Sequence, residues 1–366
     1  MRLRARKSIY LPAALAGLLA LGACTSPAGE EPGGEAETAA PEGEEAGGEN
    51  GEAGGVVRVV SHDSFNLEEG LFAQFTETTG YELEFSAPGD AGALVNQLIL
   101  TKDSPLGDVV YGIDNSFAAR AIDAEILEDY APAELPGEAA DYLIDGGNAL
   151  TPIDLGDVCL NVDHEWFDEN DLPEPEDFDD LLNADYEGLT VLTNPAQSSP
   201  GLAFLLATIS NFDGDWVNYW DDLLANDVKI VDGWSDAYYT DFTANGGSRP
   251  IALSYSTSPA FTLDDDGDST TGSLLDTCFR QVEYAGVPAG AENPEGARAF
   301  VDFLLSEDVQ GEIAESLYMY PVAPVDLPED WVAHAPLAEK PHQLDPADIE
   351  ANLDDWLRTW QDDVIG

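Results

Sequence analysis

Three segments place aromatic side chains among polar, turn-forming residues, a combination suited to binding a flat cationic molecule. They are residues 232–239, 254–261 and 317–322. Trp234 follows an apolar run, 228–231, that predicts a buried strand, and Ser235 with Asp236 predicts the cap of a helix beginning at once. The carboxyl ends of strands in α/β sheets present ligand-binding groups. Trp234 alone fits simple packing over a helix start, but three such loops together favour an aromatic-lined cleft.

Polar residues follow the strands of a predicted first α/β unit. Strands at 56–61, 81–87 and 108–113 alternate with helices at 67–79 and 93–100, which predicts a parallel sheet with right-handed crossovers. We expect the polar residues after these strands to lie along one edge of the sheet. They are His62, Asp63, Ser64, Asp90, Asp114 and Asn115.

A second α/β unit follows, with strands at 189–193, near 228 and near 251, and an apolar helix at 201–212. The turn before this helix contains Ser198, Ser199, Pro200 and Gly201. A Ser cap with Pro in the first turn leaves backbone N–H groups pointing outward, which suits an anion. A plain helix cap is the alternative interpretation.

Extended segments at 155–162 and 280–287 flank the second unit, so we expect two lobes with the chain crossing between them. The predicted lobe 1 comprises residues 56–153 and 288–345, and lobe 2 comprises residues 154–287. The crossings near Leu155 and Val287 are the expected hinges. Residues 346–366 predict an amphipathic helix on which Trp356 and Trp360 share one face and pack.

The N-terminal region predicts export. A basic start, a short apolar run and Leu21-Gly22-Ala23-Cys24 resemble a bacterial lipoprotein signal, with residues 1–23 removed and Cys24 lipidated. A chance cysteine behind an ordinary signal peptide is the alternative. Residues 24–55 are Gly, Glu, Ala and Pro in the main, without aromatic or basic residues, which predicts a disordered acidic tether.

The formal net charge of −60 argues against a nucleic-acid partner, because phosphate binding needs clustered Lys and Arg. Acidic residues are spread along the chain, as in residues 177–180 and 264–266. We interpret this as adaptation to high salt, where screening removes self-repulsion and charge preserves solubility.

Two cysteines remain after Cys24, and both lie in strand-like runs. In an exported protein, Cys159 and Cys278 predict a disulfide. Two separate buried thiols are the alternative. With two thiols and four scattered histidines, we expect no metal site.

Catalytic signatures are weak. Residues 233–237 approach a nucleophile elbow but end in Ala237 instead of Gly. The pair His164-Glu165 lacks the second histidine of a zinc protease, and residues 264–268 miss the register of a calcium loop. An exported hydrolase using Ser235 or Ser198 is therefore a distant alternative.

Several motifs together resemble the thiamine-binding component of bacterial thiamine ABC transporters. They are Asp-Ser-Phe at 63–65, Ile-Asp-Asn at 113–115, Ser-Ser-Pro-Gly at 198–201, Gly-Trp-Ser-Asp-Ala-Tyr at 233–238, the segment 254–261 and Tyr-Met-Tyr-Pro-Val at 318–322. The resemblance implies an α/β fold, a two-lobed periplasmic-binding-protein clamp of type II, with a mixed sheet flanked by helices in each lobe.

The resemblance also implies a binding protein without enzymatic activity, cofactor or metal, which delivers thiamine or its phosphates to a membrane permease. It implies a monomer outside the cytoplasm, held at the membrane by its lipid. The implied ligand-binding residues are His62, Asp63, Ser64, Asp90, Asp114, Asn115, Ser198, Ser199, Gly201, Trp234, Ser235, Tyr238, Tyr255, Ser258, Phe261, Tyr318 and Tyr320.

The chain departs from the family pattern at three aromatic positions. His62 and Phe261 replace tyrosines, and Tyr318 replaces a tryptophan. The thiazolium cation suits the faces of Trp234, Phe261 and Tyr318. Asp90 or Asp114 is able to accept from the aminopyrimidine, and the turn at 198–199 suits a phosphate. A polyamine or ferric-iron binder, with iron held by Tyr238, Tyr239 and Tyr255, is the alternative on the same clamp.

Overall fold

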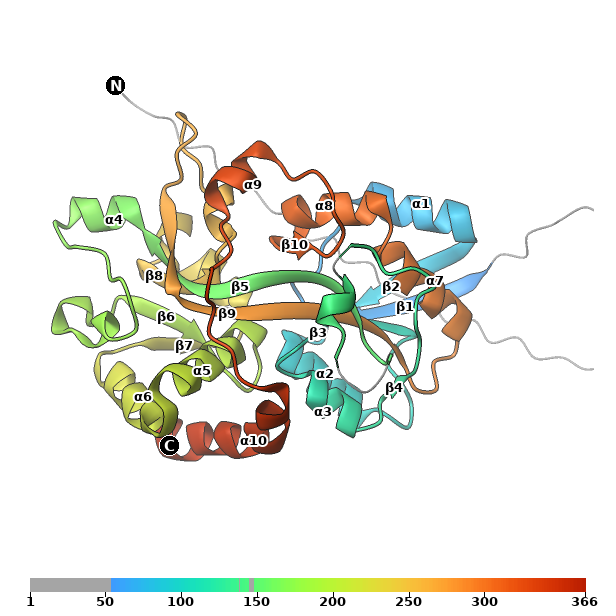
Figure 1. Ribbon diagram of the computed structural model, residues 1–366, viewed down its shortest axis with the longest axis horizontal. Helices are drawn as coiled ribbons and strands as arrows, with labels where there is room; N and C mark the ends of the chain where they lie inside the picture. Colours follow the sequence, from blue (N-terminus) through green and yellow to red (C-terminus); the bar gives the residue numbers. More distant parts are fainter. Residues whose placement is uncertain (1–53, 138, 145–147) are drawn as a thin grey trace, which may run out of the picture. The chain divides into compact units, whose positions relative to one another are not determined.

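A mixed sheet of ten strands forms the centre of the protein (Figure 1). This computed structural model describes residues 54–137, 139–144 and 148–366. The main strand order is β2-β1-β3-β9-β5-β8-β6-β7, with β10 beside β5 and β4 beside β9. The strands are β1 Gly55–Ser61, β2 Tyr81–Ser86, β3 Val109–Asp114, β4 Leu127–Glu128, β5 Thr151–Asp163, β6 Thr190–Thr193, β7 Lys229–Val231, β8 Ile251–Tyr255, β9 Thr271–Pro288 and β10 Tyr320–Pro321. The predicted signal peptide, Cys24 and all of the tether before residue 54 lie outside the described residues.

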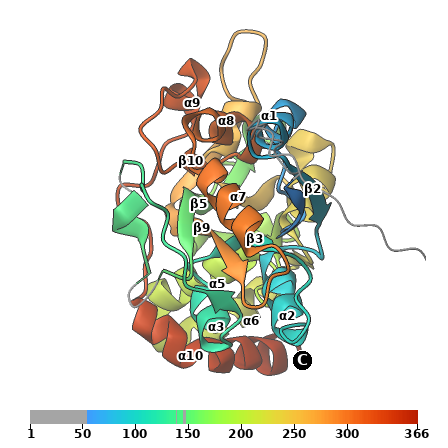
Figure 2. The same cartoon turned by 90° about the vertical axis from the view of Figure 1, so that its right-hand side faces the viewer.

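Helices flank the sheet on both faces (Figures 1 and 2). Near β1 and β3, α7 packs on one face and α2 on the other. The helices are α1 Glu69–Thr79, α2 Ala91–Leu100, α3 Ala118–Asp123, α4 His164–Glu169, α5 Ser199–Phe212, α6 Trp216–Ala225, α7 Pro294–Leu304, α8 Glu307–Leu317, α9 Glu329–His334 and α10 Pro346–Thr359, with π-helices at Asp236–Asp241 and Trp360–Ile365.

The first half of the sheet confirms the predicted parallel unit, since β1 pairs in parallel with both β2 and β3. Its interior strands are apolar, and Val57, Val59, Val109 and Val110 are fully buried. Helix α1 ends where the sequence predicts, because Gly80 adopts the left-handed conformation with φ 77° that a C-terminal cap requires. The residues after β1 and β3 therefore reach the same edge.

The second half repeats this arrangement, since β6 pairs in parallel with β7 and β8. Helix α5 is buried along most of its length against β5, β8 and β9. Gly201 belongs to this packing, because a Cβ there would lie 2.5 Å from the Thr193 carbonyl oxygen. Ser198 caps α5 as predicted, with its Oγ accepting from the Gly201 N–H at 3.5 Å.

Two long antiparallel strands join the halves. β5 and β9 pair with each other over most of their lengths; β9 also pairs with β3, and β5 with β8. The predicted disulfide is confirmed, since Cys159 of β5 is bonded to Cys278 of β9. The predicted extended segments, 155–162 and 280–287, lie within these strands and run almost to their C-terminal ends. The exact lobe limits and the hinges at Leu155 and Val287 stay predictions.

The predicted cap after β7 is wrong. Residues 236–241 form a π-helix, and neither Ser235 nor any other side chain caps its start. The Ser235 Oγ instead lies 3.4 Å from the Ser64 Oγ of the first half. At the start of this helix the Ala237 N–H donates to the Gly233 carbonyl at 3.2 Å.

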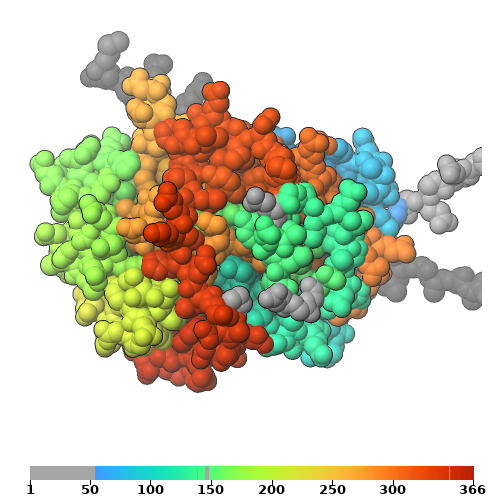
Figure 3. Space-filling model, viewed as in Figure 1, coloured from blue at the N-terminus to red at the C-terminus, as the bar shows by residue number. Residues whose placement is uncertain are grey.

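The C-terminal segment crosses the face shown in Figure 3 and contacts both halves. α10 packs on α3, and the following π-helix packs on α6. The predicted packing role of the tryptophans is confirmed for Trp360, which is buried and meets Trp220 edge to face at 5.7 Å between ring centroids. Trp356 is partly buried against the same core. Within the described residues, no helix is both long and apolar enough to span a membrane.

Candidate functional site

A cavity of about 430 Å³ lies where the two halves of the sheet present their strand ends. Both halves contribute side chains to it. The lining residues are His62, Asp63, Ser64, Asn66, Asp90, Tyr111 and Glu283, then Ser199, Pro200, Trp234, Ser235, Tyr239 and Tyr255, and finally the segment Glu315–Met319 at the end of α8. The volume falls within the range usual for small-molecule sites.

An aromatic wall surrounds Trp234. Its indole stacks on Tyr238 with ring centroids 5.2 Å apart and planes 12° apart. The indole Nε1–H donates to the Ser254 Oγ at 2.8 Å, which fixes the ring. Tyr239, Tyr255 and Tyr318 each present a ring edge-on to Trp234, at 5.2, 6.1 and 5.9 Å between centroids. Since Tyr238 covers one face of the indole, the cavity is lined by the remaining surface and by the neighbouring rings.

The cavity is acidic. Asp63, Asp90, Glu283 and Glu315 line it, and none of the described lining residues is Lys or Arg. Burial, the largest influence, raises the pKa of Asp90, although His62 and backbone N–H groups oppose that shift. Carboxylates beside electron-rich aromatic faces stabilise a positive charge. This combination therefore favours a cationic ligand over an anionic one.

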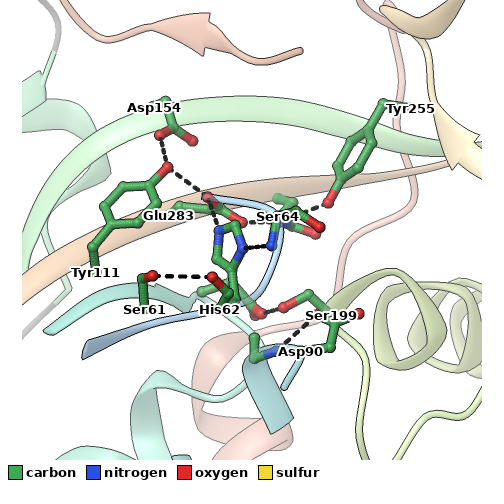
Figure 4. A network of polar contacts seen from close by, with 12 residues as sticks. Ser61, His62, Ser64, Asp90, Tyr111, Asp154, Ser199, Tyr255 and Glu283 are labelled. Atoms are coloured by element: carbon green, nitrogen blue, oxygen red, sulfur yellow. Dashed lines mark hydrogen bonds and ion pairs between the residues drawn. The ribbon is translucent and has the colours of Figure 1, made fainter. Parts of the chain in front are cut away.

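A buried polar chain lies beneath the cavity (Figure 4). The Tyr111 hydroxyl lies 2.5 Å from Asp154 Oδ2 and 2.8 Å from Glu283 Oε2. One hydroxyl has one proton to donate, so one of these carboxyl groups must itself be protonated. Burial and then the charge of Glu283 raise the pKa of Asp154 well above its ordinary range, which identifies Asp154 as the protonated partner.

Glu283 is the charged member of this chain. Burial alone would raise its pKa, but His62, Tyr111 and Gln281 outweigh burial and lower it. The His62 Nε2 lies 3.4 Å from Glu283 Oε2, and Gln281 donates to Glu283 Oε1 at 2.9 Å. Glu283 therefore presents a fixed negative charge at the floor of the cavity.

His62 titrates in response to this charge. Burial disfavours its protonated form, but the charges of Glu283 and then Asp90 outweigh burial and raise the pKa of His62 to about 9. The Ser64 N–H donates to His62 Nδ1 at 3.2 Å, and protonation of the ring would break that bond. The bulge in β3 makes room for the ring, because a Cβ at Gly112, where φ is 92°, would lie 2.1 Å from His62 Cδ2.

Several predicted site residues have structural partners instead of cavity positions. Asp114 accepts from the Ser116 N–H at 2.6 Å and from the Ser199 hydroxyl, and burial raises its pKa to about 6. Asn115 bonds to the backbone of β9 through Arg280 and Val282. The Ser199 hydroxyl is therefore engaged by a carboxylate.

Nine of the seventeen predicted ligand-binding residues line the cavity. They are His62, Asp63, Ser64, Asp90, Ser199, Trp234, Ser235, Tyr255 and Tyr318. The other eight lie elsewhere: Asp114, Asn115, Ser198, Gly201, Tyr238, Ser258, Phe261 and Tyr320. Tyr238 lies beneath Trp234, Ser258 bonds to Ser254 at 2.8 Å, and Phe261 packs on Tyr318 and Trp331. The Tyr320 hydroxyl donates to the Ala335 carbonyl.

The sequence reasoning missed Tyr111 and Glu283 because both lie inside strands. Residues two apart along a strand share a face, and Gln281 and Glu283 are polar residues two apart in the run 281–288, which is otherwise uncharged. That pattern was the available signal for Glu283. Tyr239 also lines the cavity, whereas Tyr238, which shares its motif, does not.

Among the described residues, neither serine of the hydrolase alternative, Ser235 or Ser198, is hydrogen-bonded to a histidine. The Ser235 Oγ contacts Ser64, and the ring nitrogens of His62 contact the Ser64 N–H and Glu283. Ser198 is occupied in capping α5. Among the described residues, no group of three or more His, Cys, Asp or Glu side chains is arranged to hold a metal ion.

Known proteins are similar to this chain in sequence and in fold. Residues 104–352 match the family described as bacterial extracellular solute-binding protein. The chain is 28% identical over 317 residues to the thiamine-binding periplasmic protein of Escherichia coli K12, covering 84% of this chain and 92% of that protein. A solved periplasmic thiamin binding protein is 27% identical with a TM-score of 0.72, covering 84% of this chain and 96% of that one. A ferric binding protein from Campylobacter jejuni shares the fold alone, at 16% identity, with a TM-score of 0.66 and coverage of 83% and 98%.

The predicted fold class is confirmed by these neighbours, which are periplasmic binding proteins with the same two-lobed α/β architecture. The matching sequences are solute-binding proteins, not enzymes. The sheet order, the cavity between the halves and the family match agree with one another. The chain therefore belongs to the bacterial extracellular solute-binding protein family.

Proposed function

We propose that this protein captures thiamine, or its phosphates, outside the cytoplasm and delivers it to the permease of an ABC transporter. The observation that carries the proposal is the cavity itself, which is lined by aromatic rings and four carboxylic acids, without a Lys or Arg among the described lining residues. The thiamine-binding names of the relatives support the same ligand.

Thiamine matches both walls of the cavity. Its thiazolium ring carries a permanent positive charge and has flat faces, which suit the rings of Trp234, Tyr239 and Tyr318. Its aminopyrimidine donates hydrogen bonds, and the carboxylates of Asp90 and Glu283, which also line the cavity, are acceptors. The ring of His62, where the family pattern has tyrosine, lies against Glu283 beside them.

The acidic lining favours the unphosphorylated cation. Each phosphate adds negative charge, and the predicted phosphate seat at Ser198 and Ser199 has both hydroxyls engaged, one by the α5 cap and one by Asp114. We therefore expect affinity to decrease from thiamine to its monophosphate and diphosphate. The high negative charge of the chain would also attract a cation, an effect that salt screens.

The proposed place of action follows from the N-terminal signal. A lipid on Cys24 and an acidic tether over residues 24–55 would hold the binding protein at the outer surface of the membrane, within reach of its permease. A single polypeptide supplies both walls of the cavity, which is consistent with a monomer.

A polyamine is the second candidate, because an acidic, aromatic cavity also suits an organic polycation. Native mass spectrometry of the purified protein, followed by identification of the released ligand, distinguishes these possibilities. Thiamine or a thiamine phosphate supports the proposal, and a polyamine or iron contradicts it. Incubation with thiamine monophosphate tests the hydrolase alternative, since a hydrolase would release phosphate and a binding protein would not.

A further inference from the structure

The N-terminus of α2 contacts the other half of the protein directly. The backbone N–H groups of Gly92 and Ala93 donate to the Gln197 carbonyl at 2.8 and 3.2 Å. Helix α2 belongs to the β2-β1-β3 half, whereas Gln197 lies between β6 and α5 in the other half. The first N–H groups of a helix have no partner within the helix. A carbonyl from across the cleft therefore satisfies two of them, and we call this contact the α2–Gln197 seam.

Gly92 makes this close approach possible. A Cβ at position 92 would lie 2.8 Å from the Ala196 oxygen and 2.8 Å from the carbonyl carbon and oxygen of Gln197. All of these atoms belong to the backbone, so no side chain is able to rotate out of the way. The opposing turn is held in place, because Asn194 accepts from the Ala196 N–H at 2.9 Å and from the Gln197 N–H at 3.1 Å. Any larger residue at position 92 must push the halves apart.

The seam also sets the distance between two walls of the cavity. Asp90, which precedes α2, accepts from the Ala91 N–H at 2.7 Å and from the Trp234 N–H at 3.2 Å. Asp90 and Trp234 both line the cavity and belong to opposite halves. The docking of α2 on Gln197 therefore fixes the carboxylate relative to the indole.

We propose that Gly92 is a positioning residue for ligand capture, acting by allowing the α2–Gln197 seam to hold the two halves together around the cavity. The seam consists of protein atoms, so it stabilises the closed arrangement whichever ligand is bound. A change that removes the seam lowers the fraction of protein that is competent to bind. It therefore weakens the binding of every ligand by the same factor. Measuring this decrease in affinity with thiamine as the ligand rests on the proposed function.

The variant Gly92→Ala tests this role against the matched control Gly70→Ala. Gly70 is exposed in α1, and a Cβ there would meet nothing within 4 Å. Alanine forms helices better than glycine, which offsets part of the stability lost with the seam, so the affinities are compared well below each unfolding midpoint. We expect Gly92→Ala to weaken the binding of thiamine and of thiamine monophosphate equally. The expected decrease in affinity is about ten- to thirtyfold, because two backbone hydrogen bonds are lost. Gly70→Ala should leave both affinities unchanged.

Solution scattering without added ligand gives a readout that does not depend on thiamine. We expect a larger radius of gyration for Gly92→Ala than for the parent or Gly70→Ala. If the parent does not bind thiamine, the proposed function fails and the radius alone decides the role of the seam. Equal radii would overturn the inference. Parent-like binding of both ligands would overturn it too, and so would a loss confined to one ligand, which would make Gly92 a local ligand contact.

Discussion

Replacement of Trp234 should reduce both thiamine affinity and folding stability, by amounts that can be estimated separately. The indole is 8% exposed, stacks on Tyr238 and donates to Ser254. Removing such a buried ring costs about 3–5 kcal/mol of unfolding free energy. Loss of the cation–aromatic contact and of the buried ligand area should cost about 2–4 kcal/mol of binding free energy. Trp234→Ala should therefore bind thiamine roughly 30- to 1000-fold more weakly.

Trp234→Phe separates the aromatic face from the hydrogen bond. A phenyl ring retains a face toward Tyr238 and the cavity but has no N–H to donate. The Ser254 Oγ keeps its contact with Ser258 at 2.8 Å, so the substitution leaves no orphaned hydroxyl. We expect Trp234→Phe to lose about 1 kcal/mol of binding free energy or less.

Trp356→Ala is the matched control, because Trp356 is a partly buried tryptophan on α10 outside the cavity. We expect its unfolding midpoint to fall while its thiamine affinity stays close to that of the parent. Isothermal titration well below each midpoint, with urea unfolding of the same samples, measures both quantities. Trp234→Ala binding thiamine as tightly as the parent would refute the assignment of this wall to the ligand.

Three further outcomes follow from the disulfide, the net charge and the buried histidine. Replacing Cys159 and Cys278 by Ser should lower the unfolding free energy by about 4–5 kcal/mol, because their separation of 119 residues closes a long loop; an unchanged urea midpoint would contradict this. Unfolding midpoints should rise between low and high NaCl, because screening reduces the repulsion behind a net charge of −60, and equal midpoints would disprove adaptation to salt. Burial opposes the charge on His62, but Glu283 and its neighbours raise its pKa from 6.5 to about 9. The resulting stability is present below pH 6.5 and is lost as the pH rises through about 9. The shift corresponds to about 3 kcal/mol, less about 1 kcal/mol for the broken Ser64 bond; a pH profile that His62→Gln leaves unaltered would rule out this origin.

The parallel units were predictable because their signals are local. Apolar runs, Gly80 after α1 and Ser198 before α5 each mark an element boundary within a few residues. The Cys159–Cys278 disulfide was predictable from export and from an even number of thiols. Eight of the nine predicted cavity residues lie at or just after the ends of strands, which the sheet brings together at one edge, and Tyr318 follows α8.

The remaining site residues depend on contacts that sequence spacing does not encode. Asp114 ends β3, much as Asp63 lies just beyond the end of β1, yet Ser116 and Ser199 engage the Asp114 carboxylate. Tyr238 and Tyr239 are neighbours in one motif, and the π-helix turns the first beneath Trp234 and the second toward the cavity. Glu283 lies inside an eighteen-residue strand where burial would ordinarily exclude a charge. Its partners are His62, which follows β1, and Tyr111 of β3, so their meeting requires the folded sheet.

Calorimetric titration of the mature protein with thiamine, at low and at high salt, tests the proposed ligand most directly. We expect saturable one-to-one binding at both salt concentrations, with thiamine bound more tightly than its diphosphate because the cavity lining is acidic. Higher salt should weaken binding without abolishing it, since the aromatic contacts remain. An absence of saturable binding at millimolar thiamine, or tighter binding of spermidine in the same titration, would contradict thiamine as the ligand.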